Sequence, residues 1–165
     1  SITTEGHYDF CDEVLEFAKK LGVNDIITLG GFAEGKMEDD PRIIAAVSSA
    51  KVKKKYSKYK LDFGKDHPVG TVIGASGMLV GMSENYGMSS ILLLGETFGM
   101  PLIMDPKAAD SLLHVLIRIL GVKLDLNKLE KTVEEMKERL KKTEDIHKKL
   151  LQDTGKPKDD VRYIG

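Results

Sequence analysis

The sequence predicts an α/β domain with a mainly parallel sheet and helices on both faces of that sheet, followed by one long amphipathic helix. Short apolar runs bounded by glycine alternate with helical patterns, which is typical of parallel strands joined by crossover helices. The run at residues 90–94 is continuously apolar from Ile91 onward, as buried parallel strands are. Beyond residue 124 a seven-residue repeat replaces this alternation.

The first predicted helix starts near Thr4 and ends at Gly22, where a glycine can close a helix. Its apolar residues recur at intervals of three and four, so they share one face. A short buried strand at residues 25–29 follows, ending at Gly30 and Gly31, and the polar stretch 32–41 is expected to be a loop. The apolar face of the helix holds Tyr8, Cys11, Val14, Leu15, Ala18 and Leu21.

The middle of the chain predicts two further strands and a basic helix. Residues 42–47 and 70–74 are apolar enough for strands, and the lysine-rich residues 50–60 are expected to be helical. Ser76 can cap a helix that runs to about Tyr86.

The second half of the domain predicts one more helix, at residues 106–120. Asp105 is expected to cap it, Pro106 to fill its first position and Gly121 to end it. The helix is apolar on most sides and is therefore expected to be largely buried. Its polar residues form one narrow stripe made of Lys107, Asp110, Ser111, His114 and Arg118.

The chain is expected to divide into three parts: an α/β domain at residues 3–123, a heptad helix at residues 124–153 and a flexible tail at residues 154–165. The narrow apolar seam of the helix suits packing against another helix, so we expect it to form a homo-oligomer interface. The predicted interface residues are Leu126, Leu129, Val133, Met136, Leu140 and Leu150.

Composition argues against several classes of partner. The formal net charge of −1 gives no global field for nucleic acid or an acidic membrane. No stretch is apolar enough to span a bilayer, and the start of the chain lacks the plan of a signal peptide. The single Cys11 excludes an internal disulfide and fits a reducing, cytoplasmic compartment. We expect no cofactor.

One glycine turn has two interpretations. Residues 74–77, Gly-Ala-Ser-Gly, join a strand to a helix, as a nucleophile elbow does, but Met78 stands where that elbow needs glycine. Ser76 is therefore interpreted as a helix cap rather than a nucleophile.

Other polar residues also allow both a structural and a functional interpretation. The histidines His7, His67, His114 and His147 have no metal-ligand spacing, so no metal site is expected. Three carboxylates border apolar segments where strand ends converge; they could serve acid–base chemistry, but caps and solvated loop residues are favoured. Residues 51–60 could bind nucleic acid through lysines and two tyrosines, but a solvated helix is favoured. The three carboxylates are Glu34, Glu84 and Glu96.

Three segments, in their order and spacing, resemble the proteasome-assembly-chaperone family, specifically the archaeal relatives of its second eukaryotic member. The resemblance covers residues 3–142. Members normally have a further N-terminal portion, and we expect one here too, because a parallel α/β domain usually opens with a strand. The segments are ITLGGFAEG at residues 27–35, IGASGML at residues 73–79, and LLGET at residues 93–97 followed by DPKAA at residues 105–109.

This resemblance implies a three-layer α/β/α sandwich like that of nucleoside phosphorylases, without their chemistry. It implies homo-oligomers that bind proteasome α subunits or the assembled core. Several proteins that dock on the ring of proteasome α subunits end in a hydrophobic residue, a tyrosine and any residue. Here Tyr163 is third from last, one position earlier than in that pattern. We expect Tyr163, Ile164 and the carboxylate of Gly165 to contact the core.

Two other functions remain open. The first is an enzyme of phosphorylase or hydrolase type, with its site at the strand ends near Gly31, Ser76 and Glu96, although no complete catalytic set can be assembled. The second is a purely structural oligomer built through the heptad helix.

Overall fold

The computed structural model describes residues 4–33, 40–64, 74–97, 99 and 105–123, together with helical positions 131, 134, 135, 138 and 142. The chain divides into two compact units, Ser1–Leu124 and Asp125–Gly165, and all the elements below belong to the first. In chain order they are α1 (Thr4–Lys20), β1 (Asp25–Ala33), β2 (Ile43–Val47), α2 (Ala50–Tyr56), the 3-10 helix η1 (Ser57–Tyr59), α3 (Ala75–Met82), the 3-10 helix η2 (Ser83–Tyr86), β3 (Ser89–Thr97) and α4 (Pro106–Leu120).

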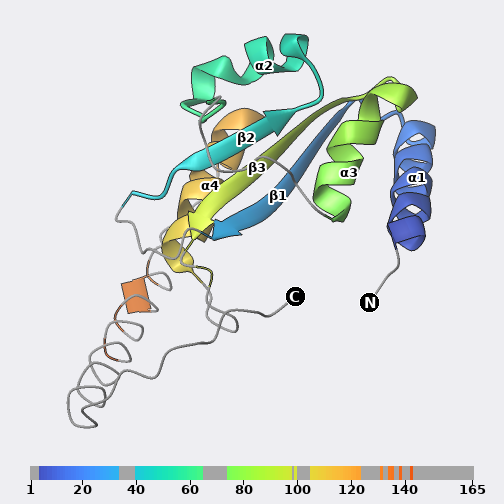
Figure 1. The fold of residues 1–165 in the computed structure, drawn as a ribbon. Coiled ribbons are helices and arrows are strands. Elements are labelled where there is room, and N and C mark those ends of the chain that lie inside the picture. The colour runs from blue at the N-terminus through green and yellow to red at the C-terminus, as the bar shows by residue number, and fades with distance from the viewer. Residues whose placement is uncertain are drawn as a thin grey trace, which may run out of the picture. The chain divides into compact units, whose positions relative to one another are not determined.

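The described strands form one small sheet in the order β1-β3-β2 (Figure 1). β1 pairs in parallel with β3 along its whole length, from Asp25 opposite Ser89 to Ala33 opposite Thr97. β3 is therefore the central strand, and its residues from Ser90 to Glu96 are all buried. The prediction of a mixed α/β fold is confirmed.

The direction of β2 differs from the prediction of parallel strands. β2 runs antiparallel to β3, with Ile43 opposite Gly95 and Val47 opposite Ile91. Parallel strands need a crossover of about a dozen residues or more, usually a helix. Only residues 34–42 separate β1 from β2, and their sequence is polar and rich in turn formers. The expectation of a parallel strand is therefore wrong for β2.

The two glycines predicted to end the first strand lie inside it. A Cβ atom at Gly30 would come within 2.9 Å of Leu94 Cδ2, and one at Gly31 within 3.2 Å of Thr97 Cγ2. Glycine within a strand often marks such a close approach rather than a turn. β1 consequently continues to Ala33, and the predicted end at Leu29 is wrong.

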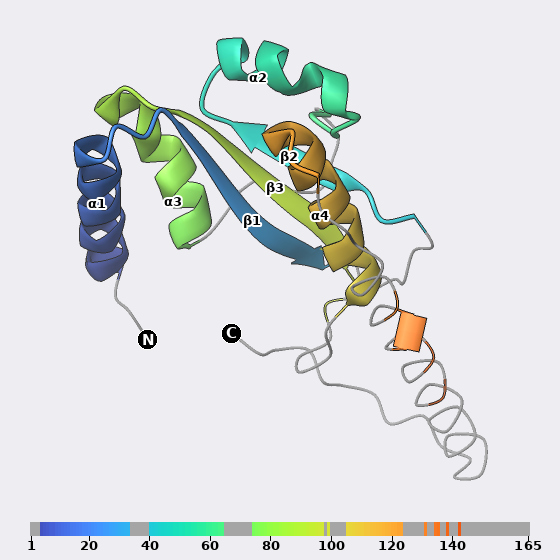
Figure 2. The same ribbon diagram turned by 180° about the vertical axis from the view of Figure 1, so that it is seen from behind.

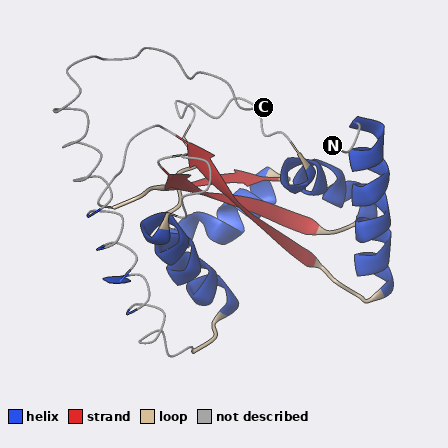
Figure 3. Ribbon diagram, turned by 90° about the horizontal axis from the view of Figure 1, so that it is seen from below, coloured by secondary structure: helices blue, strands red, loops and turns tan. Residues whose placement is uncertain are grey.

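Helices cover both faces of the sheet. On one face, Val80 of α3 packs against Ile44, Leu92 and Leu94. On the other face, α2 and α4 pack against alternate residues of the same strands, and Figures 2 and 3 show this arrangement from behind and from below. The buried residues of this second cluster are Ile43, Ala45, Val52, Tyr56, Ile91, Leu93 and Val115.

Helix α1 lies against α3 and η2 and buries only part of its apolar face (Figure 1). Cys11 and Leu15 are fully buried, and Cys11 Sγ lies 3.7 Å from the carbonyl oxygen of Ala75. Burial raises the pKa of the Cys11 thiol. The predicted positions Tyr8 and Leu21 are instead exposed, as are Phe10 and Phe17.

The ends of α1 and α4 confirm the predicted caps. Gly22 and Gly121 both adopt positive φ, 75° and 65°, which glycine allows without a Cβ clash. Asp105 Oδ1 accepts hydrogen bonds of 3.1 Å from the backbone N–H groups of Lys107 and Ala108, as an N-cap carboxylate does. Pro106 occupies the first helical position.

The predicted cap at Ser76 is wrong. Helix α3 begins one residue earlier, at Ala75, and Gly74 occupies the N-cap position with φ of 96° and no side-chain cap. A backbone that needs positive φ there favours the glycine over a serine cap. Ser76 instead lies in the first turn, and its carbonyl oxygen accepts a 3.2 Å hydrogen bond from Thr28 Oγ1.

Some predictions fall outside the described residues. They include most of the strand at residues 70–74, nearly all of the heptad helix and the tail. The boundaries at residues 123 and 153 stay predictions. No helix in the described part of the chain is long and apolar enough to cross a bilayer.

Candidate functional site

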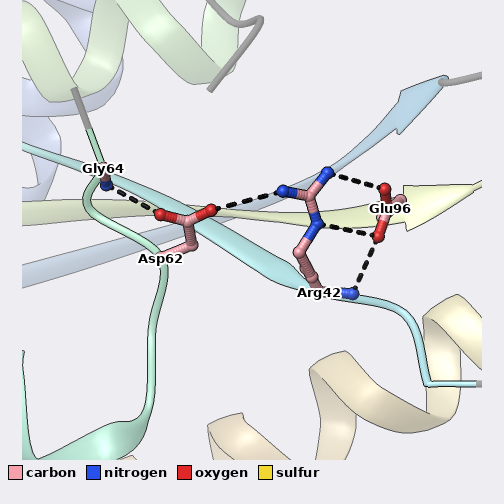
Figure 4. Close-up of polar contacts among 4 residues, drawn as sticks. All are labelled: Arg42, Asp62, Gly64 and Glu96. Atoms are coloured by element: carbon pink, nitrogen blue, oxygen red, sulfur yellow. Dashed lines mark hydrogen bonds and ion pairs between the residues drawn. The ribbon is translucent and has the colours of Figure 1, made fainter. Parts of the chain in front are cut away.

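The antiparallel register of β2 and β3 brings two charged residues together at the end of the sheet. Glu96 backbone N–H donates to the Arg42 carbonyl oxygen at 3.0 Å, and Arg42 backbone N–H donates to Glu96 Oε2 at 3.1 Å. The Arg42 guanidinium also donates to both carboxylate oxygens, through Nε at 3.2 Å and Nη2 at 2.9 Å. The carboxylate is 2% exposed, so this forked contact neutralises a buried charge (Figure 4).

Arg42 also faces a second carboxylate. Its Nη1 lies 3.7 Å from Asp62 Oδ2, and Asp62 Oδ1 accepts a 2.7 Å hydrogen bond from Gly64 N–H (Figure 4). Asp62 is held in place by its own backbone, which exchanges 2.8 Å hydrogen bonds with Ala45 and Ile43 on the side of β2 that faces away from β3. The guanidinium therefore lies between a buried and a partly exposed carboxylate.

A pocket of about 500 Å³ opens beside this cluster. Its walls come from the residues around the start of β2, the segment after η1 and one side of α4. The volume lies within the range of about 300–1,000 Å³ that is usual for ligand sites. The lining residues are Asp40, Pro41, Arg42, Ile43, Lys60, Asp62, Asp110, Ser111, His114, Val115 and Arg118.

The α4 wall of the pocket contains four residues of the predicted polar stripe, Asp110, Ser111, His114 and Arg118, together with the apolar Val115, whereas Lys107 of the stripe does not line it. His114 Nδ1 lies 2.9 Å from the Asp110 carbonyl oxygen; because a carbonyl only accepts, Nδ1 carries the proton. Arg118 Nε donates to the His114 carbonyl oxygen at 3.3 Å. Asp110 Oδ1 is buried without a hydrogen-bond partner in the described structure, although His114 Nδ1 lies 3.4 Å away. This contact does not satisfy the oxygen, because 3.4 Å is long for a hydrogen bond and Nδ1 already donates to the carbonyl oxygen.

The opposite wall holds a lysine in an unusual backbone conformation. Lys60 ends η1 with φ of 52° and ψ of 44°, and it is the only residue other than glycine with positive φ in the described part of the chain. Such a conformation is uncommon for a side-chain-bearing residue. Sequence patterns did not reveal Lys60, because they do not show backbone dihedral angles.

The residues predicted for an enzyme site come together only in part. Gly31 and Glu96 lie on neighbouring strands at one end of the sheet, since Gly31 pairs with Gly95. Ser76 bonds Thr28, three residues earlier in β1 and therefore about 10 Å along the strand. Among the residues described, no histidine forms a hydrogen bond with Ser76.

The three carboxylates predicted near converging strand ends differ in burial and position. Glu96 is buried against Arg42, so its interpretation as a cap or a solvated residue is wrong. Glu84 is exposed in η2, and Glu34 lies outside the described residues. His67 and His147 also lie outside them, and no three His, Cys, Asp or Glu side chains group to hold a metal within the described ranges.

The lysine-rich segment is a solvated helix with its aromatic rings turned inward. Tyr56 is 3% exposed within the core, and Tyr59 packs against the same cluster. Lys55 Nζ lies over the Tyr56 ring and pairs with Asp25, whose hydrogen bond is the main cause of the raised pKa of Lys55. Tyr56 therefore presents no free ring face on which a base could stack.

The predicted interface and docking residues remain untested. All of them lie outside the described residues: Leu126, Leu129, Val133, Met136, Leu140, Leu150, Tyr163, Ile164 and Gly165.

Comparison with known proteins gives a consistent family assignment. The sequence profile of the PAC2 family matches residues 1–144. An uncharacterised protein of Methanocaldococcus jannaschii is 30% identical over 168 residues, covering all of this chain and 64% of that protein. The crystal structure of Pyrococcus furiosus PbaB, described as an archaeal proteasome activator, matches with a TM-score of 0.76 and 32% identity over 86% of this chain and 59% of PbaB.

A second Pyrococcus furiosus structure also matches. PbaA, described as an archaeal homologue of proteasome-assembly chaperone, superposes with a TM-score of 0.72 at 26% identity, over 90% of this chain and 60% of PbaA. The chain spans less than two thirds of the length of each of these relatives.

Proposed function

The chain belongs to the PAC2 family, and on that premise we propose that it is a protein-binding factor, without catalytic activity of its own, that acts on the proteasome as a homo-oligomer. The observation that carries the proposal is the similarity to PbaB, which extends over 86% of the chain at 32% identity. PbaB is described as a proteasome activator and PbaA as a homologue of an assembly chaperone, so both roles are open for this chain.

The local chemistry agrees with a binding role. The buried Glu96 carboxylate makes two hydrogen bonds with the Arg42 guanidinium and one with its backbone, so it is a poor general base. Ser76 lies in a helical turn, about 10 Å along β1 from the level of Gly31. These positions favour a structural role for the residues that the enzyme hypothesis needs.

We further propose that the α/β unit is a three-layer α/β/α sandwich and that residues 124–153 form the oligomer interface through their heptad seam. Leu126, Leu140 and their seam neighbours would otherwise leave apolar surface in water. The charged tail would carry Tyr163 and Ile164 to the proteasome core in the cytoplasm, and several tails on one oligomer would add avidity.

The test is binding of the full chain to purified archaeal proteasome α subunits and, separately, to the assembled core. Capture of free α subunits with faster core assembly supports the chaperone role; capture of the assembled core with faster peptide hydrolysis supports the activator role. Light scattering on the same samples gives the oligomeric mass. Binding to neither species at micromolar concentration would refute the proposal.

A chain ending at Asp160 separates the docking role of the tail from a structural one. We expect it to keep the oligomeric mass and to lose affinity for the core. An unchanged affinity would show that Tyr163 and Ile164 do not anchor the protein, and a smaller mass would show that they hold the oligomer together.

A further inference from the structure

The pocket beside α4 holds charges that its own residues do not pair. Arg42 is committed to Glu96 and Asp62. Lys60 and Arg118 line the same pocket, and neither forms an ion pair with a carboxylate in the described part of the chain. In the described structure Arg118 donates only through Nε, to the His114 carbonyl oxygen, which leaves its two terminal nitrogens able to donate.

The same pocket contains an acceptor that lacks a donor. Asp110 Oδ1 is buried and makes no hydrogen bond in the described structure. A buried polar atom of this kind is rare, because leaving it without a partner costs free energy that a single N–H group recovers. A ligand that fits the pocket therefore brings both a negative group, for the two cations, and a hydrogen-bond donor, for Asp110.

The backbone of Lys60 gives independent support. Glycine occupies the left-handed conformation at no steric cost, and it does so at Gly22, Gly87 and Gly121 in this chain. Lysine at the equivalent position after η1 adds strain, and residues held in such conformations cluster at functional sites. Lysine supplies a positive charge on a flexible side chain at the pocket, which glycine would not supply.

We propose that this pocket binds an acidic segment of a partner protein, with carboxylates of the segment paired to Lys60 and Arg118 and one of its N–H groups donating to Asp110 Oδ1. Peptides supply carboxylates and N–H donors at separate positions, as this mixed lining requires. A phosphate group concentrates its negative charge at one point and brings no N–H donor for Asp110 Oδ1. The inference rests on the proposed function, in that it takes the partner to be a protein.

The direct test uses the full chain and a labelled, end-capped peptide of four glutamates flanked by glycines, with the matching glutamine peptide as control. Fluorescence anisotropy at low salt is expected to show tighter binding of the glutamate peptide. Lys60→Gln and Arg118→Gln should each weaken it roughly tenfold, while Lys58→Gln, which removes a nearby charge outside the pocket, should leave it unchanged.

Lys60→Gly separates binding from folding. This change removes the charge and relieves the left-handed strain, so the thermal midpoint should stay equal or rise while peptide affinity falls as in Lys60→Gln. A lower midpoint would show that the lysine serves the fold and would count against the proposal. Equal affinity of the glutamate and glutamine peptides, or unchanged affinity in the Lys60 and Arg118 variants, would overturn it.

Two further measurements identify the partner. Displacement of the glutamate peptide by inorganic phosphate at equal or lower concentration would assign the pocket to small anions and overturn the peptide proposal. Proteasome binding is measured with the same variants. If the wild type binds the proteasome and the Lys60 and Arg118 variants bind it equally well, the pocket is not its contact and the pocket proposal fails. If the wild type does not bind the proteasome, the proposed function fails, while the peptide experiment still decides on the pocket.

Discussion

Two carboxylates near the end of the sheet, Glu96 and Asp110, differ in their hydrogen bonding. Glu96 is fully buried and accepts three hydrogen bonds from Arg42, so its charge is compensated within the fold. Asp110 lies across the pocket on α4, and its buried oxygen has no hydrogen bond in the described structure. The difference indicates that the first carboxylate stabilises the protein, whereas the second is available to a ligand. Four substitutions test that contrast, starting from the change with the largest expected effect.

Arg42→Met should remove the ion pair that compensates the Glu96 carboxylate. It leaves the Glu96 carboxylate buried without its guanidinium partner, which is expected to lower the free energy of unfolding by about 3 kcal/mol. Urea denaturation followed by circular dichroism measures the loss. Adding Glu96→Leu to the same chain should recover part of it, because the unpaired charge is then gone. A loss under about 1 kcal/mol would mean that the pair behaves like an exposed ion pair.

Gly95→Ala should disturb the contact that holds α4 against the sheet. The added Cβ would lie 3.0 Å from Leu112 Cδ1 and 3.1 Å from the Ala108 carbonyl oxygen, so the helix must shift. We expect a loss of about 2 kcal/mol in unfolding free energy, together with weaker peptide binding at the pocket. Gly81→Ala is the matched control, since nothing lies within 4 Å of its Cβ position; the control should be neutral or slightly stabilising. Equal stability of the two variants would show that Gly95 is not a close contact.

Asp105→Ala removes the N-cap of α4 without touching the pocket. Two backbone N–H groups lose their acceptor, and a loss of about 1 kcal/mol is expected in the same denaturation experiment. Asp105→Asn keeps a cap and should retain most of the stability. A similar loss in both variants would attribute the effect to the charge rather than to the cap.

Asp110→Asn should have the smallest effect on stability, and the opposite sign. It removes a negative charge that is partly buried and unsatisfied, so the free energy of unfolding should rise by less than about 1 kcal/mol. A loss of stability close to that of Arg42→Met would show that Asp110 is structural, and the contrast between the two carboxylates would fail.

The sequence predicted correctly those features that depend on residues close together in the chain. Asp105, Pro106 and Gly121 gave both ends of α4, because capping depends on residues a few positions apart. The polar stripe of α4 was predicted in the same way, and four of its residues line the pocket. Cysteine burial and the helix ending at Gly22 also followed from spacing alone.

Features that depend on distant residues were missed. Glu96 and Arg42 are 54 residues apart, and their contact exists only because β2 runs antiparallel with Ile43 opposite Gly95. Gly30 and Gly31 were interpreted as a strand end because the side chains that crowd them, Leu94 and Thr97, belong to another strand. Strand direction and cross-strand crowding are tertiary properties, which local patterns do not contain.

The buried Cys11 makes the chain its own reporter of partial opening. As the single thiol in the sequence, it lies under α3, and both its burial and its raised pKa oppose reaction with a disulfide reagent. The rate at which a reagent labels this thiol in the native protein therefore measures how often α1 separates from α3. The measurement is the equivalent of an amide-exchange experiment at a single site. Comparing that rate with the global unfolding rate tells whether α1 detaches as a unit of its own or only when the sheet itself is lost.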